Sequence, residues 1–240
     1  MISKPKVEVC FTPNVFPLYA EDFEVVVVID VLRATSAICT AFEHGVEKII
    51  PVSTLQEAIE YKNKGFHVAA ERKGKIVDGF DYGNSPLSYR NDKLKGETLV
   101  LTTTNGTKAI NIANDIEHLL IGSLLNLNAI CKYLTDLNKS VLILGSGWMN
   151  KFCLEDTICA GAISEKLLKT NNFESFNDST IAAKYLYLSA RTNFFGYLKA
   201  SSHRKRLKKL NLNEDIKYCL TANQTDVVPI REDYYLKNIS

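Results

Sequence analysis

Short apolar runs, rich in β-branched residues, alternate along the chain with segments whose apolar residues have helical spacing. The apolar runs predict β-strands at residues 7–11, 25–29, 48–52, 66–70, 98–102, 118–121 and 140–144. The helical spacing predicts helices at residues 34–44, 54–64, 107–114 and 127–137. Alternation of this kind predicts an α/β fold with a largely parallel or mixed sheet and helices on both faces.

The run VVVVI at residues 25–29 shows no alternation of apolar and polar positions, which predicts a central strand buried on both faces. Asp30, Arg33 and Thr35 follow it directly. Ligands of doubly wound sheets bind beyond the carboxyl ends of the strands, and the first N–H groups of a helix favour an anion. Asp30 is therefore placed to hold a divalent cation or a substrate, although it could equally cap the next helix.

A second polar segment follows the strand predicted at residues 98–102. It contains Thr103, Thr104, Asn105, Gly106 and Thr107, and a helix follows it. Hydroxyls, backbone N–H groups and a glycine-containing turn are typical of an anion cradle. An ordinary strand-to-helix turn with a threonine cap is the alternative. The segment is more polar than such a turn requires, which favours the cradle.

A third segment begins with Glu71 and Arg72 at the end of another predicted strand. It continues to Asn84 and Ser85, which precede Pro86. Serine followed by proline is also typical of an ordinary helix start. The charged pair at the strand end is therefore the stronger sign of function in this segment.

A fourth segment runs from the Gly-Ser-Gly at residues 145–147 to Glu155 and Asp156 in the first turn of a predicted helix. Acids in a first turn are also favoured by the helix dipole alone. The glycines suggest a dinucleotide-binding turn, but Asn150 stands where the third glycine of that motif belongs. A nucleotide-binding oxidoreductase is therefore a weaker alternative.

The character of the chain changes after residue 147. Two long helices are predicted, a basic helical run follows, and a short strand comes near the end; these are residues 154–170, 178–191, 201–209 and 226–230. A weak boundary near residues 122–128 predicts two associated lobes, 1–125 and 126–240. The first lobe carries Asp30, Glu71 and the Thr103–Thr107 loop, and the second carries Glu155 and Asp156.

Composition excludes some classes of protein. The 240 residues are 46% hydrophobic and 23% charged, with a net charge of +2, so a nucleic-acid or membrane partner is not expected. The basic run at 201–209 is interpreted as a solvated helix face. Six cysteines without a C-x-x-C pair predict reduced, buried thiols in a cytoplasmic protein, and no signal or membrane-spanning run is evident. The sequence leaves a homo-oligomer open.

Taken together, these segments resemble the 2-phosphosulfolactate phosphatase family. The matching stretches, in the family's order, are VVVVIDVLRATSAI, ERKGKIVDGFDYGNSPLSY, LVLTTTNGTKAI and FCLEDTICAGA, and SSHRKRL and TDVVPI are similar to its C-terminal pieces. The resemblance implies a three-layer α/β/α fold and a magnesium-dependent phosphatase. The family reaction converts 2-phospho-3-sulfolactate, a small anionic substrate, to 3-sulfolactate and phosphate on a route to coenzyme M.

The matching segments supply the expected site. Catalytic roles are expected for Asp30, Glu155 and Asp156, and Mg²⁺ ligands are expected from the carboxylates of Asp30, Glu71 and Asp156. Substrate contacts are expected from Arg33, Thr35, Arg72, Asn84, Ser85, Thr103, Thr104, Asn105, Gly106 and Thr107. The sequence departs from the family's pattern at the loop GSGWMNKF and at Arg204, two places where substrate contacts are expected to differ from the family's. A non-catalytic anion-binding protein is a further alternative.

Overall fold

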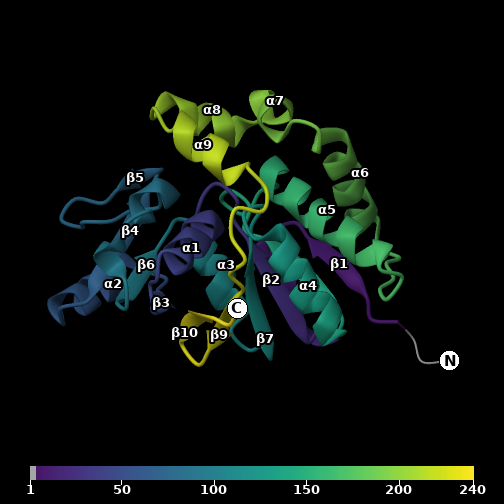
Figure 1. The fold of residues 1–240 in the computed structure, drawn as a ribbon, viewed down its shortest axis with the longest axis horizontal. Helices are drawn as coiled ribbons and strands as arrows, with labels where there is room; N and C mark the ends of the chain where they lie inside the picture. The colour runs from purple at the N-terminus through teal and green to yellow at the C-terminus, as the bar shows by residue number, and fades with distance from the viewer. Residues whose placement is uncertain (1–3) are drawn as a thin grey trace.

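The computed structural model describes residues 4–240 and contains one sheet with helices around it (Figure 1). The ten strands lie in the order β1-β8-β2-β7-β9-β10-β3-β6-β4-β5. They cover Val7–Cys10 (β1), Val25–Ile29 (β2), Lys48–Pro51 (β3), His67–Arg72 (β4), Lys75–Ile76 (β5), Thr98–Thr102 (β6), His118–Gly122 (β7), Val141–Gly145 (β8), Pro229–Glu232 (β9) and Tyr235–Asn238 (β10). Most neighbouring strands are parallel, which confirms the predicted α/β fold with a largely parallel, mixed sheet.

Helices connect most of the parallel strands. The α-helices cover Ala34–Glu43 (α1), Leu55–Asn63 (α2), Gly106–Ile112 (α3), Leu127–Leu137 (α4), Leu154–Lys169 (α5), Asp178–Ala190 (α6), Phe194–Tyr197 (α7), Ser202–Lys209 (α8) and Asn213–Cys219 (α9). Short 3₁₀ helices cover Pro13–Leu18, Ala20–Asp22, Pro86–Tyr89, Asp92–Leu94 and Leu198–Ala200. Among residues 4–240, no helix has the length and apolar character needed to cross a membrane.

Strand β2 lies inside the sheet, between β7 and β8, and is parallel to both. All five of its residues are buried, as the unbroken apolar run predicts. Val25 and Val27 pack in one hydrophobic cluster with residues of α5, whereas Val26 and Val28 pack in a second cluster with residues of α1. Helices therefore cover both faces, and the end of β2 leads directly to Asp30, which lines a cavity.

The chain's last strands form a β-hairpin that joins two groups of parallel strands. Strand β9 pairs with β7, and β10 pairs with β3. The strand predicted at residues 226–230 is wrong in its position, because β9 begins at Pro229, and β10 was not predicted at all. Most residues of the hairpin are only half-buried, so its sequence carries charged side chains instead of a recognisable apolar run.

One continuous sheet contains strands from both predicted lobes. Strand β8 pairs with β1 and β2, although it comes from residues 126–240 and they come from residues 1–125. The division near residue 125 stays a prediction. All six cysteines are free and buried, as predicted from the sequence.

The helices after β8 bring the C-terminal part of the chain back over the sheet. In Figure 1 they form an arch along the upper edge of the molecule, from α6 to α8 and α9. Helix α8 contributes side chains to the same cavity as the residues at the ends of β2 and β4. The fold thus places the basic run at residues 201–209 beside the strand ends.

Candidate active site

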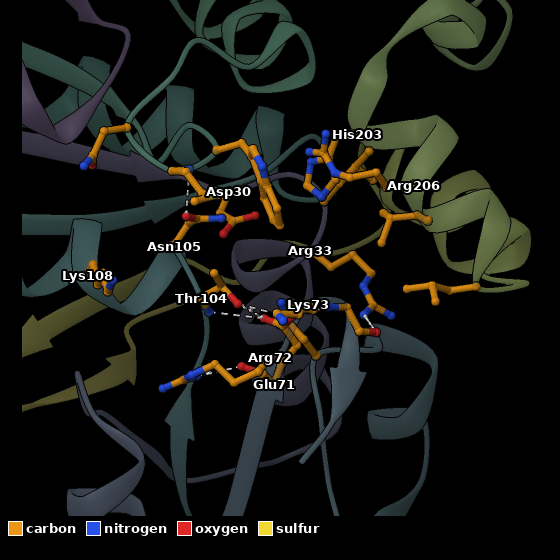
Figure 2. Close-up of a pocket in the computed structure, with 18 of the residues that line it drawn as sticks. Asp30, Arg33, Glu71, Arg72, Lys73, Thr104, Asn105, Lys108, His203 and Arg206 are labelled. Atoms are coloured by element: carbon orange, nitrogen blue, oxygen red, sulfur yellow. Dashed lines mark hydrogen bonds between the residues drawn. The ribbon is translucent and has the colours of Figure 1, made fainter.

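A cavity of about 840 Å³ lies where β2 and β4 end, and α8 closes one side of it (Figure 2). Its wall is rich in charged side chains from segments that are distant in sequence. These side chains are Asp30, Arg33, Glu71, Arg72, Lys73, Lys108, His203 and Arg206. This excess of cationic groups around two carboxylates suits a small, multiply charged anion together with a metal cation.

Asp30 is fixed in the cavity wall by the turn after β2. Its backbone N–H donates to Thr35 Oγ1 at 3.1 Å, and the Thr35 N–H donates to the Asp30 carbonyl at 3.0 Å. Thr35 is fully buried and stabilises the turn through these two hydrogen bonds, whereas the Asp30 side chain lines the cavity. Burial raises the pKa of Asp30 to about 6; the charge of His203 lowers this pKa, and the charge of Glu71 raises it further.

Glu71 connects two loops at the end of β4. Its carboxylate accepts hydrogen bonds from the Gly74 N–H at 2.5 Å and from the Thr104 N–H and hydroxyl at 3.2 Å each. Glu71 is 6% exposed and lines the same cavity as Asp30. The two carboxylates therefore converge on one space, where their like charges favour a bound cation.

Asp156 occupies a different position, behind the cavity wall. Its Oδ1 accepts from the Val31 N–H at 2.9 Å, and its Oδ2 accepts from the Gly147 N–H at 3.2 Å and the Ser146 hydroxyl at 3.3 Å. Burial raises the pKa of Asp156, and the charge of Asp30 raises it further. Asp156 thus holds the ends of β2 and β8 together.

Glu155 is bound to a histidine that sequence reasoning did not select. Its Oε1 lies 2.5 Å from His203 Nδ1, and its Oε2 accepts from the Ser201 hydroxyl at 3.4 Å. Burial acts to raise the pKa of Glu155, but the hydrogen bond and the charge of His203 lower it below its usual range. The imidazole also lines the cavity. The basic run therefore contributes to the site and is more than a solvated helix face.

Cys153 lies beside this pair. Its Sγ, a carboxylate oxygen of Glu155 and a ring nitrogen of His203 all lie within 4.8 Å of one another, so the three residues could together hold a metal ion. Burial raises the pKa of the Cys153 thiol, and the charges of Asp156 and Glu155 raise it further. No spacing in the sequence identifies this group, because His203 comes 48 residues after Glu155.

The predicted anion cradle divides into an inner and an outer part. Thr103 and Thr107 are buried, and each hydroxyl accepts the other residue's backbone N–H at 3.1 Å. Gly106 is packed against the Asp30 carboxylate. Thr104 and Asn105 line the cavity. Thr103, Gly106 and Thr107 therefore shape the loop. Thr104 and Asn105 are placed to meet a ligand.

The two predicted arginines line the cavity but already have protein partners. Arg33 is 3% exposed, forms an ion pair with Asp215 and donates from Nη2 to the Gly74 carbonyl at 3.0 Å. Arg72 donates from Nη1 to the Glu71 carbonyl at 2.6 Å and from Nη2 to Thr102 Oγ1 at 3.0 Å. Their substrate contacts stay a prediction.

Asn84 and Ser85 also differ in position. Asn84 is 6% exposed and lines the cavity, and its Oδ1 has no hydrogen-bond partner within residues 4–240. A buried amide without a partner is costly, which suits a ligand contact. Ser85 precedes the 3₁₀ helix Pro86–Tyr89, and its side chain forms no cap hydrogen bond there.

Comparison with known proteins agrees with this picture. The family model described as 2-phosphosulpholactate phosphatase matches residues 10–234. A relative from Caldanaerobacter subterraneus subsp. tengcongensis, named probable 2-phosphosulfolactate phosphatase, is 43% identical over 208 residues, which cover 85% of this chain and 86% of the relative. A relative of the same name from Clostridium perfringens is 38% identical over 229 residues, which cover 93% and 92% of the two chains.

The family match covers the segments that build the cavity, from the strand before Asp30 to helix α8. The relatives match over similar shares of both chains, so the similarity does not come from one shared segment. The chain belongs to the 2-phosphosulfolactate phosphatase family.

Proposed function

We propose that this protein is a magnesium-dependent phosphatase that hydrolyses 2-phospho-3-sulfolactate to 3-sulfolactate and phosphate. Family membership and the names of the relatives support this activity. The observation that carries the proposal is the convergence of Asp30 and Glu71 on a cavity whose wall also presents Arg72, Lys73 and Lys108. Carboxylates for a metal and cations for an anion are the groups that phosphoryl transfer needs.

The carboxylates fit a magnesium ion. Mg²⁺ prefers oxygen ligands and keeps several waters, and a cavity of about 840 Å³ leaves room for them. Asp30 and Glu71 would hold the ion, which would offset their mutual repulsion and the burial of Asp30. Asp156 is a weaker third ligand, because it lies behind the cavity wall, whereas Asp30 and Glu71 line the cavity. A bound magnesium ion would supply positive charge to polarise the phosphoryl group and a coordinated water.

The protein's own groups divide the remaining work. Asn105 and Lys108 present an amide and an ammonium group to the cavity, where they bind phosphoryl oxygens. His203 transfers a proton at Nε2, because Glu155 binds its Nδ1 and fixes the orientation of the ring. In this arrangement Glu155 is a positioning residue, and His203 is the group that meets water or the leaving oxygen.

The cellular role follows from the same chemistry. The product is a small sulfonate, which places the reaction in coenzyme M formation or in another branch of sulfonate metabolism. Six free cysteines suit a reducing compartment, so we place the enzyme in the cytoplasm. Fractionation of cells that produce the native protein tests this location, and recovery outside the cytoplasmic fraction contradicts it.

Phosphate release from 2-phospho-3-sulfolactate tests the proposed activity. We expect turnover with magnesium, loss of turnover with a chelator, and recovery when magnesium is restored. A parallel screen with other phosphorylated hydroxy acids, with and without a sulfonate, establishes the substrate class. Release from none of these compounds at any metal concentration overturns the proposed function. Equal turnover with and without metal overturns the magnesium assignment alone.

A further inference from the structure

Arg206 differs from the other arginines of the cavity in its hydrogen bonds. Its Nη1 donates to Ser202 Oγ at 3.3 Å, but Nε and Nη2 are buried and have no partner within residues 4–240. Arg33 and Arg72, in contrast, donate to side chains and carbonyls of the protein. Arg206 therefore lines the cavity and has two donor nitrogens that no group within residues 4–240 uses.

The two unused nitrogens form one edge of the guanidinium group. Their N–H bonds point the same way, so this edge can donate two parallel hydrogen bonds to two oxygens of one anion. Arginine stays charged when buried, and buried N–H donors without a hydrogen-bond partner are costly. The vacant edge is thus better suited to a ligand than to the protein alone.

A tryptophan fixes the plane of this group. The Arg206 guanidinium carbon lies 4.1 Å from the centre of the Trp148 ring, within the range of a cation–π contact. The contact limits the side chain's freedom before a ligand arrives, so less conformational entropy is lost on binding. Trp148 lies in the loop GSGWMNKF, between β8 and α5.

Arg206 also lies apart from Glu71, Arg72 and Thr104. Figure 2 shows it on α8, on the opposite side of the cavity from Glu71, Arg72 and Thr104. Glu71 and Thr104 would therefore lie beside one part of a ligand, and Arg206 would meet another part of it.

We infer that Arg206 is the specificity-determining residue that binds the sulfonate of the substrate. This inference rests on the proposed function. In 2-phospho-3-sulfolactate the carboxylate and the phosphate ester share one carbon, so they lie close together. The sulfonate is attached one carbon further away, and it is the anion that reaches the α8 side. Its oxygens accept the two hydrogen bonds of the vacant guanidinium edge.

Comparison of two substrates tests the assignment. 2-Phospholactate keeps the phosphate and the carboxylate but has a hydrogen in place of the sulfonate. We expect Arg206→Gln to lower kcat/KM for 2-phospho-3-sulfolactate by about 10- to 100-fold, the usual effect of losing a charge-assisted pair of hydrogen bonds. The same variant should change kcat/KM for 2-phospholactate by less than about threefold.

Two further variants serve as controls. Lys205→Gln removes the same charge from an exposed position on the same helix and should leave both substrates unaffected. Arg206→Lys keeps the charge but removes the two-donor edge, and should recover only part of the discrimination. Thermal melts of the variants show whether each one is folded.

The outcomes separate this inference from the proposed function. Equal losses of Arg206→Gln on both substrates overturn the sulfonate assignment, as does an unchanged kcat/KM for 2-phospho-3-sulfolactate. If the parent enzyme hydrolyses neither substrate, the proposed function itself fails. Binding of 3-sulfolactate, measured by calorimetry against lactate, gives a readout without turnover. Binding of 3-sulfolactate that does not weaken in folded Arg206→Gln overturns the inference.

Discussion

Asp30 carries its charge at a position where burial opposes ionisation. Its side chain is only 6% exposed, and Glu71 shares its cavity. The raised pKa of Asp30 reflects the same cost, because this buried carboxylate binds a proton more tightly than an aspartate exposed to water does. A group that destabilises the fold and lies in a cavity is characteristic of a functional site.

Replacing Asp30 should separate stability from activity. With a chelator present, we expect Asp30→Asn to unfold at a denaturant concentration no lower than that of the parent. Its free energy of unfolding should rise by about 1 kcal/mol. The rate of magnesium-stimulated phosphate release should be roughly 100-fold or more lower in this variant than in the parent. Urea unfolding and a magnesium titration of activity measure the two effects. Full activity in the variant contradicts the metal role of Asp30.

The pairing of His203 with Glu155 predicts strongly non-additive mutations. Each of His203→Gln and Glu155→Gln should lower kcat by about 10²- to 10⁴-fold, because the imidazole loses either its proton-transfer role or its fixed orientation. The double variant should be little worse than either single variant, since both changes disable one unit. Steady-state kinetics of the three proteins measures the coupling. If the loss of kcat in the double variant equals the product of the two single losses, the two residues act independently.

Cys153 provides a test of whether the same residues bind metal. If Glu155 and His203 serve proton transfer alone, Cys153→Ala should retain activity within about threefold and leave the bound metal content unchanged. Loss of both would instead indicate that Cys153, Glu155 and His203 form a metal centre. Elemental analysis of the purified proteins measures the metal directly.

The sequence located some of the cavity residues and missed others for a physical reason. Asp30, Glu71 and Thr104 could be found because polar residues that directly follow apolar strands meet at one edge of a parallel sheet. His203 and Arg206 lie in a basic helix whose pattern is that of a solvated surface. Only their long-range contacts, with Glu155 and Trp148, distinguish them.

At the scale of elements, the loop before α3 depends on a glycine. A Cβ atom added at Gly106 would meet the Ala34 Cβ and lie 2.8 Å from Asp30 Oδ2. The start of α1, the start of α3 and the carboxylate are therefore packed against one another without spare room. Any side chain at this position must displace part of the site.

We expect Gly106→Ala to destabilise the protein by about 1–3 kcal/mol, the usual cost of overpacking. Activity should fall as well, because the added methyl group displaces the Asp30 side chain. Denaturant unfolding and phosphate release measure the two effects. Adding Ala34→Gly removes one of the two clashes and should recover part of the stability, and an unchanged midpoint in Gly106→Ala would show that the loop can adjust freely.

Elements were predictable from the sequence where their apolar residues form a clear run or a clear helical spacing. Strands β2 and β6 were predicted at the bounds that the structure has, because each contains an unbroken run of buried apolar residues. The hairpin of β9 and β10 was misplaced or missed, because it packs mainly through Leu236 while its neighbours stay half-buried. A strand held by one anchor and by backbone pairing leaves little pattern in the sequence.

The whole molecule depends on that hairpin for the continuity of its sheet. Strands β1, β8, β2 and β7 form one parallel group, and β3, β6 and β4 form another. The hairpin lies between them, pairing Ile230 with Leu120 on one side and Leu236 with Ile49 on the other. The cavity draws on both groups, because Asp30 follows β2 and Glu71 ends β4. Catalytic geometry and sheet continuity are therefore expected to be lost together.

Shortening the hairpin's buried anchor tests this dependence. We expect Leu236→Ala to cost about 2–5 kcal/mol, because Leu236 is fully buried in the core between the two groups. Leu18→Ala is the matched control, since Leu18 is 79% exposed and should change the stability by less than about 0.5 kcal/mol. Fluorescence of Trp148, the chain's one tryptophan, and far-UV circular dichroism follow unfolding with two probes. If the hairpin couples the two groups, both probes shift to the same lower midpoint, whereas two separate transitions would show that the groups unfold independently.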